Sequence, residues 1–381
     1  MDQTHQDIAE FNSNFFFKEF TFSDNDFYPE PGVSCEFGDH TVWIDDLLII
    51  IQVKLRDIQP IVEPEREAKW LSKKVLGIAK DQIKDNIRQL RTHGTITITN
   101  NRRHAFELRP SQIKNLIKIV LYGNQYLNPL VQPKLYVSAE AGFIHVMPLN
   151  DYVGICNTLV TPYEIAEYLL FRENIIARWS APFKLPSEVA LVGQYLHDEP
   201  NAKPEESFAE YVHTLKQDRD SYDILSLLET IHGNIAYHDG TDRERDYYQV
   251  LVEFAKLHRL DLKRIKEMLR RIYEAVREDR FEKPIRVVIP HTECGFVFMN
   301  IQKEDSEHRK KYLMNTTIAA KYDDRLTRQV GVLFHSEGVD YAYANFPWRW
   351  NVVIETQLKA NFPFRKKRKN VVEDRYSFED E

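Results

Sequence analysis

The stretch that decides the fold is DHTVWIDDLLIIIQVK, residues 39–54. Its two halves, HTVWI and LLIIIQVK, are β-branched and aromatic runs typical of strands, and Asp45-Asp46 separates them as a turn. Apolar side chains occupy both alternating faces of residues 47–53, as expected for a central strand that is covered on both sides. The stretch therefore predicts an antiparallel hairpin within the core of a sheet.

This hairpin would bring three polar side chains together at its open end. If Ile44 pairs with Leu47, counting outward places Asp39 opposite Gln52, with Cβ atoms about 4.5–5.5 Å apart. Lys54 is two residues further along the same strand, so it shares that face. A lysine at the end of a buried strand is costly unless an anion or a carboxylate meets it. A metal ion between the Asp39 carboxylate and the Gln52 amide oxygen, with Lys54 beside it, would satisfy all three groups.

The residues after the hairpin predict an α/β domain. Residues 64–92 form a helical pattern with Pro64 in its first turn and Gly94 after its end. Its apolar face comprises Leu71, Val75, Ala79, Ile83, Ile87 and Leu90. Five short strand-like runs follow, namely TITIT, HAFEL, LIKIVLY, PKLYVSA and GFIHVMPL, and then a helix over about 162–172. Residues 1–175 should thus form an α/β arrangement with one sheet.

Asp39, a hairpin, Gln52-Val53-Lys54, a long helix and a further strand together resemble the PD-(D/E)XK nuclease superfamily in its Q-x-K variant, over roughly residues 10–130. The resemblance implies a restriction-endonuclease-like fold, in which a mixed sheet is flanked by helices, and Mg²⁺ or Mn²⁺ as the cofactor. Asp39 and Gln52 would bind the metal, and Lys54 would orient the attacking water or stabilise the phosphorane charge. Gln52 replaces the usual glutamate, which implies weaker Mg²⁺ binding.

A site of this kind usually has a further carboxylate. Glu36 lies three residues before Asp39, and strict alternation points it to the other face unless Gly38 forms a bulge. Glu19 lies in the preceding element and is an equally good candidate. Glu10 is a third possibility, so the sequence leaves this choice open.

The predicted long helix has more basic than acidic side chains. Four of its lysines could contact a nucleic-acid backbone, although a solvated helix face is the more common reason for such a pattern. These are Lys73, Lys74, Lys80 and Lys84. Gln82 on the same helix could reach the site. His145 alternates with apolar neighbours, which favours a core histidine over a metal ligand.

Composition excludes several classes of protein. The net charge is −7, so phosphate contacts must come from local basic patches rather than from the whole surface. Three scattered cysteines without a C-x-x-C pair argue against a disulfide framework and a cysteine zinc site, and favour a cytoplasmic setting. No signal peptide, membrane-spanning run, phosphate-binding glycine loop or hydrolase motif is recognisable.

The 381 residues are too many for one ordinary core and divide by pattern into three segments. Residues 1–175 would be the nuclease domain, 187–278 a helical domain, and 284–381 an α+β domain with the basic run RKKRK in its tail. A break is expected between Arg172 and Glu188. The later segments would select substrate, sense a trigger or build a homo-oligomer.

The sequence thus leads to two hypotheses of different classes. The first is a Mg²⁺-dependent nuclease acting on DNA, with RNA still open as the substrate and with microbial defence or restriction suggested by the resemblance alone. The alternative is a catalytically silent protein of the nuclease fold that serves as a binding or scaffold module, which the neutral Gln52 and the acidic net charge favour.

Overall fold

The computed structural model describes residues 3–23, 26–30, 33–56, 63–124, 126–127, 133–179, 185–216, 235–238 and 245–347. The chain divides into two compact units. The first comprises Met1–Thr230 with Tyr247–Arg270, and the second Ile231–Asp246 with Arg271–Glu381. The basic run RKKRK lies outside the described residues.

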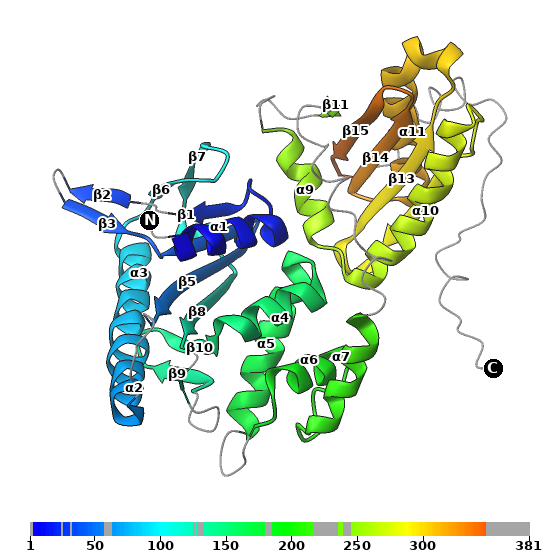
Figure 1. Ribbon diagram of the computed structural model, residues 1–381. Coiled ribbons are helices and arrows are strands. Elements are labelled where there is room, and N and C mark those ends of the chain that lie inside the picture. The colour runs from blue at the N-terminus through cyan, green and yellow to red at the C-terminus, as the bar shows by residue number, and fades with distance from the viewer. Residues whose placement is uncertain are drawn as a thin grey trace. The chain divides into compact units, whose positions relative to one another are not determined.

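The first unit is built on a six-stranded mixed sheet (Figure 1). In spatial order its strands are β1 (Thr21–Ser23), β4 (His40–Ile44), β5 (Leu47–Leu55), β8 (Asn115–Gly123), β10 (Gly142–Pro148) and β9 (Leu135–Ser138). The central strands β5, β8 and β10 are parallel, whereas β1, β4 and β9 pair antiparallel with their neighbours. Two small hairpins, β2 (Asp26–Glu30) with β3 (Val33–Glu36) and β6 (Ile96–Thr99) with β7 (Ala105–Leu108), complete the β-structure of this unit in the described residues. The predicted mixed sheet flanked by helices is confirmed.

The predicted hairpin forms in the predicted register. Ile44 pairs with Leu47 and His40 with Ile51, and Asp45 adopts a positive φ in the turn between the strands. Every side chain from Leu47 to Val53 is buried. Strand β5 is therefore covered on both faces, as its uninterrupted apolar sequence predicts.

A single long helix covers one face of the sheet and contains a π-helical middle. It runs through α2 (Pro64–Trp70), the π-helix η1 (Leu71–Ala79) and α3 (Lys80–Thr92). An α-helix turns about 100° per residue, so each four-residue step between its apolar positions overshoots a full turn by about 40°. A π-helix is wider, and the same step falls short of a full turn. The π segment therefore offsets the drift and keeps all six predicted apolar positions buried.

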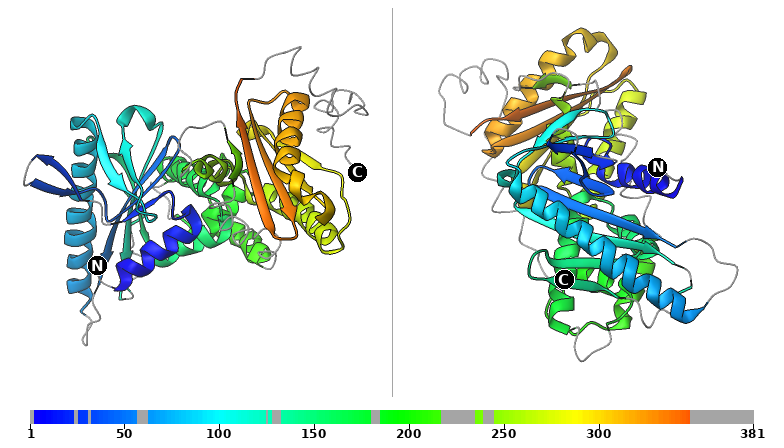
Figure 2. Two further views of the ribbon diagram at one scale, coloured as in Figure 1. Left: turned by 90° about the horizontal axis from the view of Figure 1, so that it is seen from above. Right: turned by 90° about the vertical axis from the view of Figure 1, so that its left-hand side faces the viewer.

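The other face of the sheet is covered by helices from the middle of the chain (Figure 2). Among the described residues, the other α-helices that lie wholly in the unit are α1 (Gln3–Phe16), α4 (Leu149–Leu159), α5 (Pro162–Trp179), α6 (Glu188–Leu196), α7 (Ala209–Lys216) and α9 (Tyr247–Ala255). Buried Arg172 of α5 pairs with buried Glu188 of α6. The break predicted between these two residues therefore falls inside one packed unit, and the helical segment 187–278 is shared between the two units. Helix α10 (Arg259–Arg277) spans their boundary.

The second unit is α+β, as its sequence pattern predicts. Its five strands in spatial order are β11 (Ile235–His238), β15 (Gly338–Asn345), β14 (Arg328–His335), β13 (Cys294–Asn300) and β12 (Ile285–Ile289). Helix α11 (Arg309–Asp324) packs on this sheet through Leu313 and Ala320. The contribution of β11, from the predicted helical segment, was not foreseen. Among all described helices, none has the length and apolar character needed to cross a bilayer.

Candidate active site

The open end of the β4–β5 hairpin positions Asp39. Gly38 adopts a φ of +76° just before it, a conformation that favours glycine, and the chain turns there into β4. Asp39 stands one residue before the pair His40–Ile51, which places it at the level of Gln52. Its Oδ2 accepts a 2.7 Å hydrogen bond from the backbone N–H of Val53. This bond holds the carboxylate against β5 beyond the last strand pair.

Lys54 joins Asp39 and Gln52 into one polar cluster. Its Nζ lies 3.3 Å from Asp39 Oδ2 and 3.5 Å from Gln52 Oε1, and it donates to the Val53 carbonyl at 2.9 Å. Asp39 and Gln52 are buried, whereas the Lys54 side chain keeps 18% of its surface exposed. The predicted convergence of these three side chains is thus confirmed, and solvent can reach the cluster from the lysine side.

The long helix adds two amide side chains that face Gln52. Asn86 Oδ1 lies 3.4 Å from Gln52 Nε2, and Asn86 Nδ2 donates to the Glu36 carbonyl at 3.0 Å. Gln82 approaches the opposite side of the Gln52 amide. The sequence named Gln82 as a residue that could reach this place, and it does. Asn86 was missed; the available signal was a polar residue beside Ile87, on the buried face of a helix.

The Gln52 amide admits two orientations. In one, its nitrogen faces Asn86 and its oxygen faces Asp39 and Gln82. In the other, the nitrogen donates to Asp39 Oδ1 at 2.7 Å, Asp39 Oδ2 at 3.1 Å and Gln82 Oε1 at 3.2 Å. In the first orientation the amide oxygen occupies that same place, so four oxygen atoms converge. Such a group of acceptors is unfavourable unless positive charge lies beside it. The Lys54 ammonium, within 3.5 Å of Asp39 Oδ2 and Gln52 Oε1, supplies one such charge, and a cation would supply more.

These oxygens fit a hard divalent cation. Mg²⁺ prefers oxygen ligands and is commonly held by one or two carboxylates, with substrate phosphates and water completing its shell. Asp39 supplies the carboxylate, and Gln52 and Gln82 supply amide oxygens. With one carboxylate beside the Lys54 ammonium, the charge at the site is close to neutral, which predicts weak binding until a phosphate group arrives.

The structure places Glu36 and Glu19, the two leading candidates for a further carboxylate, in different surroundings. Glu36 ends β3, and its side chain is exposed, while its backbone carbonyl receives Asn86. Glu19 is buried and accepts hydrogen bonds from Arg102 at 2.8 Å and Tyr247 at 3.1 Å. Since β1 runs antiparallel to β4, Glu19 lies toward the Ile44 end of that strand, away from Asp39. Glu19 therefore does not join this site.

The four candidate lysines fall into two groups. Lys73 and Lys74 are exposed on the π-helical segment. Lys80 and Lys84 both pair with Asp81, at 3.3 and 3.6 Å, and Lys80 also lies over the Tyr136 ring. The first pair is consequently better placed than the second to meet a phosphate backbone.

A network at the same end of the sheet was not foreseen from the sequence. Arg56, just beyond β5, binds the buried Glu67 carboxylate with Nε and Nη2, each at 3.0 Å from one oxygen. Asn124, just beyond β8, donates to Glu67 at 2.7 Å. The Arg56 hydrogen bonds lower the pKa of Glu67 below its ordinary value. This network connects the start of α2 to the carboxyl ends of two parallel strands beside Lys54.

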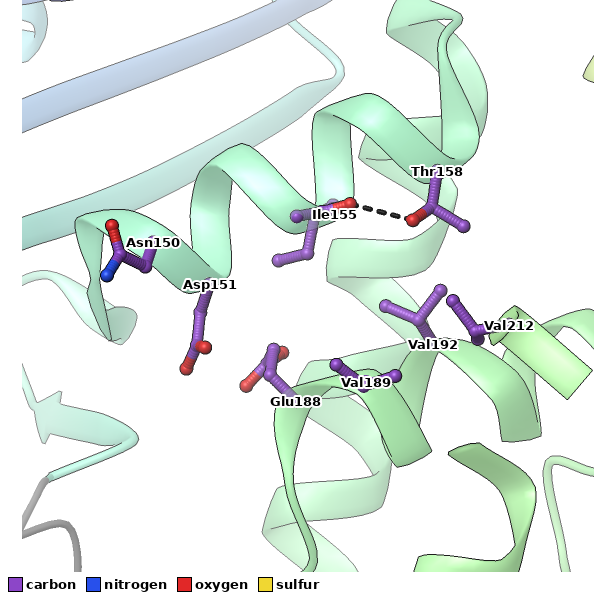
Figure 3. Close-up of a pocket in the computed structure, with 9 residues that line it drawn as sticks. Asn150, Asp151, Ile155, Thr158, Glu188, Val189, Val192 and Val212 are labelled. Atoms are coloured by element: carbon purple, nitrogen blue, oxygen red, sulfur yellow. Dashed lines mark hydrogen bonds between the residues drawn. The ribbon is translucent and has the colours of Figure 1, made fainter. Parts of the chain in front are cut away.

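Two further polar places are distinct from the cluster. His145 is buried beside Arg172, and burial lowers its pKa well below the ordinary value, so the predicted core histidine is confirmed. Between α4 and α6, Asp151 and Glu188 point into a pocket (Figure 3). Its volume of about 50 Å³ leaves room for only a few water molecules. Burial, followed by the nearby charge of Glu188, raises the pKa of Asp151.

No family model, no curated protein and no solved structure matches the chain.

Proposed function

We propose that the first unit is a metal-dependent nuclease with a restriction-endonuclease-like core of the PD-(D/E)XK kind, acting on DNA. The observation that carries this proposal is the position of Lys54 Nζ, within 3.5 Å of both Asp39 and Gln52 at the carboxyl end of β5. Ligands commonly bind at the carboxyl ends of strands in α/β sheets. The hairpin, the long helix and the parallel strand also follow one another in the order on which the resemblance to these nucleases rests, which supports the proposal.

In this proposal each polar side chain has one task. Asp39 and Gln52 hold the cation through their oxygens, with Gln82 at the edge of the same group. A bound Mg²⁺ would supply a Lewis acid and a water molecule with a lowered pKa. Lys54 Nζ, the partly exposed member, donates to the attacking water or to the phosphoryl oxygen on which negative charge develops.

The substrate would complete this weakly charged site. Because one carboxylate is balanced by one ammonium, the scissile phosphate brings the negative charge that a divalent cation needs. The protein as a whole is acidic, so backbone phosphates would be held by local lysines such as Lys73 and Lys74. Affinity for the metal and affinity for DNA should therefore rise together.

One observation favours the alternative, a catalytically silent scaffold. Asp39 already accepts from Val53 and Lys54, and the second orientation of Gln52 satisfies the amide without a cation. A cluster whose carboxylate and amide nitrogen are hydrogen-bonded without a metal is consistent with a purely structural role. Only the response to metal separates these two functions.

The experiment is cleavage of plasmid DNA, linear DNA and RNA in Mg²⁺, in Mn²⁺ and in EDTA. The nuclease proposal expects cleavage of DNA with metal, none in EDTA and none by Asp39→Ala. Asp85→Ala is the matched control, since Asp85 is an exposed aspartate of α3 that pairs with Arg88. Absence of both cleavage and metal binding in the unaltered protein would leave the scaffold.

A further inference from the structure

The side chains around the Gln52 amide do not favour its two orientations equally. Asp39 and Gln82 on one side present oxygen atoms and favour the nitrogen of Gln52, whereas Lys54 Nζ on that side is a donor and favours its oxygen. Asn86 on the other side also presents an oxygen and favours the same nitrogen. A single NH₂ group cannot face both sides, so these neighbours compete for it.

Asn86 cannot resolve this competition by turning over. Its Nδ2 donates to the Glu36 backbone carbonyl at 3.0 Å, and a carbonyl oxygen can only accept. The Asn86 oxygen is therefore held toward Gln52. Asn86 and Gln52 are 3% and 2% exposed, so bulk water cannot readily replace either partner. A buried donor or acceptor that loses its partner destabilises the fold, so each of these groups strongly favours a paired orientation.

We propose that Asn86 is a positioning residue that turns the carbonyl oxygen of Gln52 toward Asp39 and Gln82, where a divalent cation binds. The contacts that set this orientation run from the Glu36 carbonyl through Asn86 to Gln52 and form the Glu36–Asn86–Gln52 relay. Without a cation, the Asp39 oxygens pull the nitrogen the other way. With a cation among the oxygens that demand disappears; the Asn86 acceptor then holds the Gln52 nitrogen on its own side, and Lys54 Nζ donates to the Gln52 oxygen. This inference rests on the proposed metal-dependent function and explains how a neutral glutamine serves as a ligand.

The relay makes a prediction that a merely structural asparagine does not. Asn86→Leu removes the acceptor and leaves Gln52 free to donate to Asp39, which turns its oxygen away from the cation. Mn²⁺ affinity should fall about 10- to 100-fold, the usual effect of losing a group that orients a ligand. In a Gln52→Glu background the ligand is a carboxylate with oxygens on both sides. There, Asn86→Leu should leave Mn²⁺ affinity unchanged or raise it, because no orientation has to be chosen.

The experiment is Mn²⁺ titration by calorimetry of the full chain, without substrate, in four proteins: unaltered, Asn86→Leu, Gln52→Glu and the double variant. Circular dichroism checks that each is folded, and Asn86→Ala carries the same prediction if the leucine variant is not. A loss confined to the Gln52 background supports the relay. Equal losses in both backgrounds, or none in either, overturn it. If the unaltered chain binds Mn²⁺ no better than Asp39→Ala, the proposed function fails, and the relay fails with it.

Discussion

Arg172 Nε lies 2.6 Å from Glu188 Oε1, and the two side chains are 0% and 2% exposed. Glu188 also accepts from Tyr168, and Arg172 donates to the Lys134 carbonyl. This ion pair is fully inside the first unit and ties α6 to α5. It is one of the contacts through which the sheet and the following helices form one packed unit.

Removing the carboxylate charge should therefore destabilise the whole unit. Glu188→Gln leaves the Arg172 guanidinium buried without a counter-charge, a change that usually costs about 3–5 kcal/mol of unfolding free energy. Urea unfolding measures it. Glu140→Gln is the control, because Glu140 pairs with Arg88 on the surface and should cost about 1 kcal/mol or less. Equal losses in the two variants would show that the buried pair adds nothing.

Low pH should remove the contribution of the Arg172–Glu188 ion pair to the free energy of unfolding. Burial opposes ionisation, but Arg172 and Lys134 hold the pKa of Glu188 at about 2, below its ordinary value of 4.5. Since the folded-state pKa is lowered, the stabilisation is present above pH 4.5 and is lost as the pH falls toward 2. Thermal unfolding over this range should be steeper in pH for the unaltered protein than for Glu188→Gln. Parallel curves would contradict the assignment.

Lys54→Ala should separate metal binding from the chemical step. Asp39 keeps its Val53 hydrogen bond, so the carboxylate stays in place and Mn²⁺ affinity should be retained or increased. The loss of the ammonium should lower the cleavage rate about 10²- to 10³-fold. Lys114→Ala, at an exposed lysine paired with Asp46, is the control. A Lys54→Ala protein that cleaves at the normal rate would exclude the assigned role.

Gln52→Glu should make stability depend on metal. Without a cation, the new carboxylate faces Asp39 and Asn86 oxygens in a buried place and should lower the melting temperature. Mg²⁺ or Mn²⁺ relieves this repulsion and should raise the melting temperature by more than in the unaltered protein. Thermal scans with metal and with EDTA test it. A loss of stability that metal does not reverse would argue against a cation site.

Lys73 and Lys74 should contribute to DNA binding through phosphates. Their combined replacement by alanine should weaken binding to all sequences and reduce the slope of log K against log salt by about 2, which corresponds to two released counterions. Fluorescence anisotropy at several salt concentrations measures this. Lys310→Ala with Lys311→Ala removes two exposed lysines from the second unit and serves as the control. An unchanged slope would place the DNA path elsewhere.

Local pattern in the sequence was enough to predict the hairpin register, the buried face of the long helix and the convergence of Asp39, Gln52 and Lys54. Strand pairing has a period of two residues, so one turn of known length determines which side chains meet across the whole hairpin. Apolar residues recur every four positions from Leu71 to Ile87. They stay on one face more easily where the helix has more residues per turn than an α-helix, as in the π-helical segment. These features depend on residues close together in the chain.

Only the tertiary structure decided which distant side chains complete the site. Asn86 and Gln82 reach Gln52 because the helix packs at one particular height on the sheet, and periodicity specifies a face but not a height. Glu19 was an equal candidate by sequence, yet the antiparallel pairing of β1 carries it to the far end of β4, toward Arg102. The sequence predicted a linker between Arg172 and Glu188, whereas in the structure the two side chains form a buried ion pair. Such contacts depend on how whole elements dock, which no short-range pattern encodes.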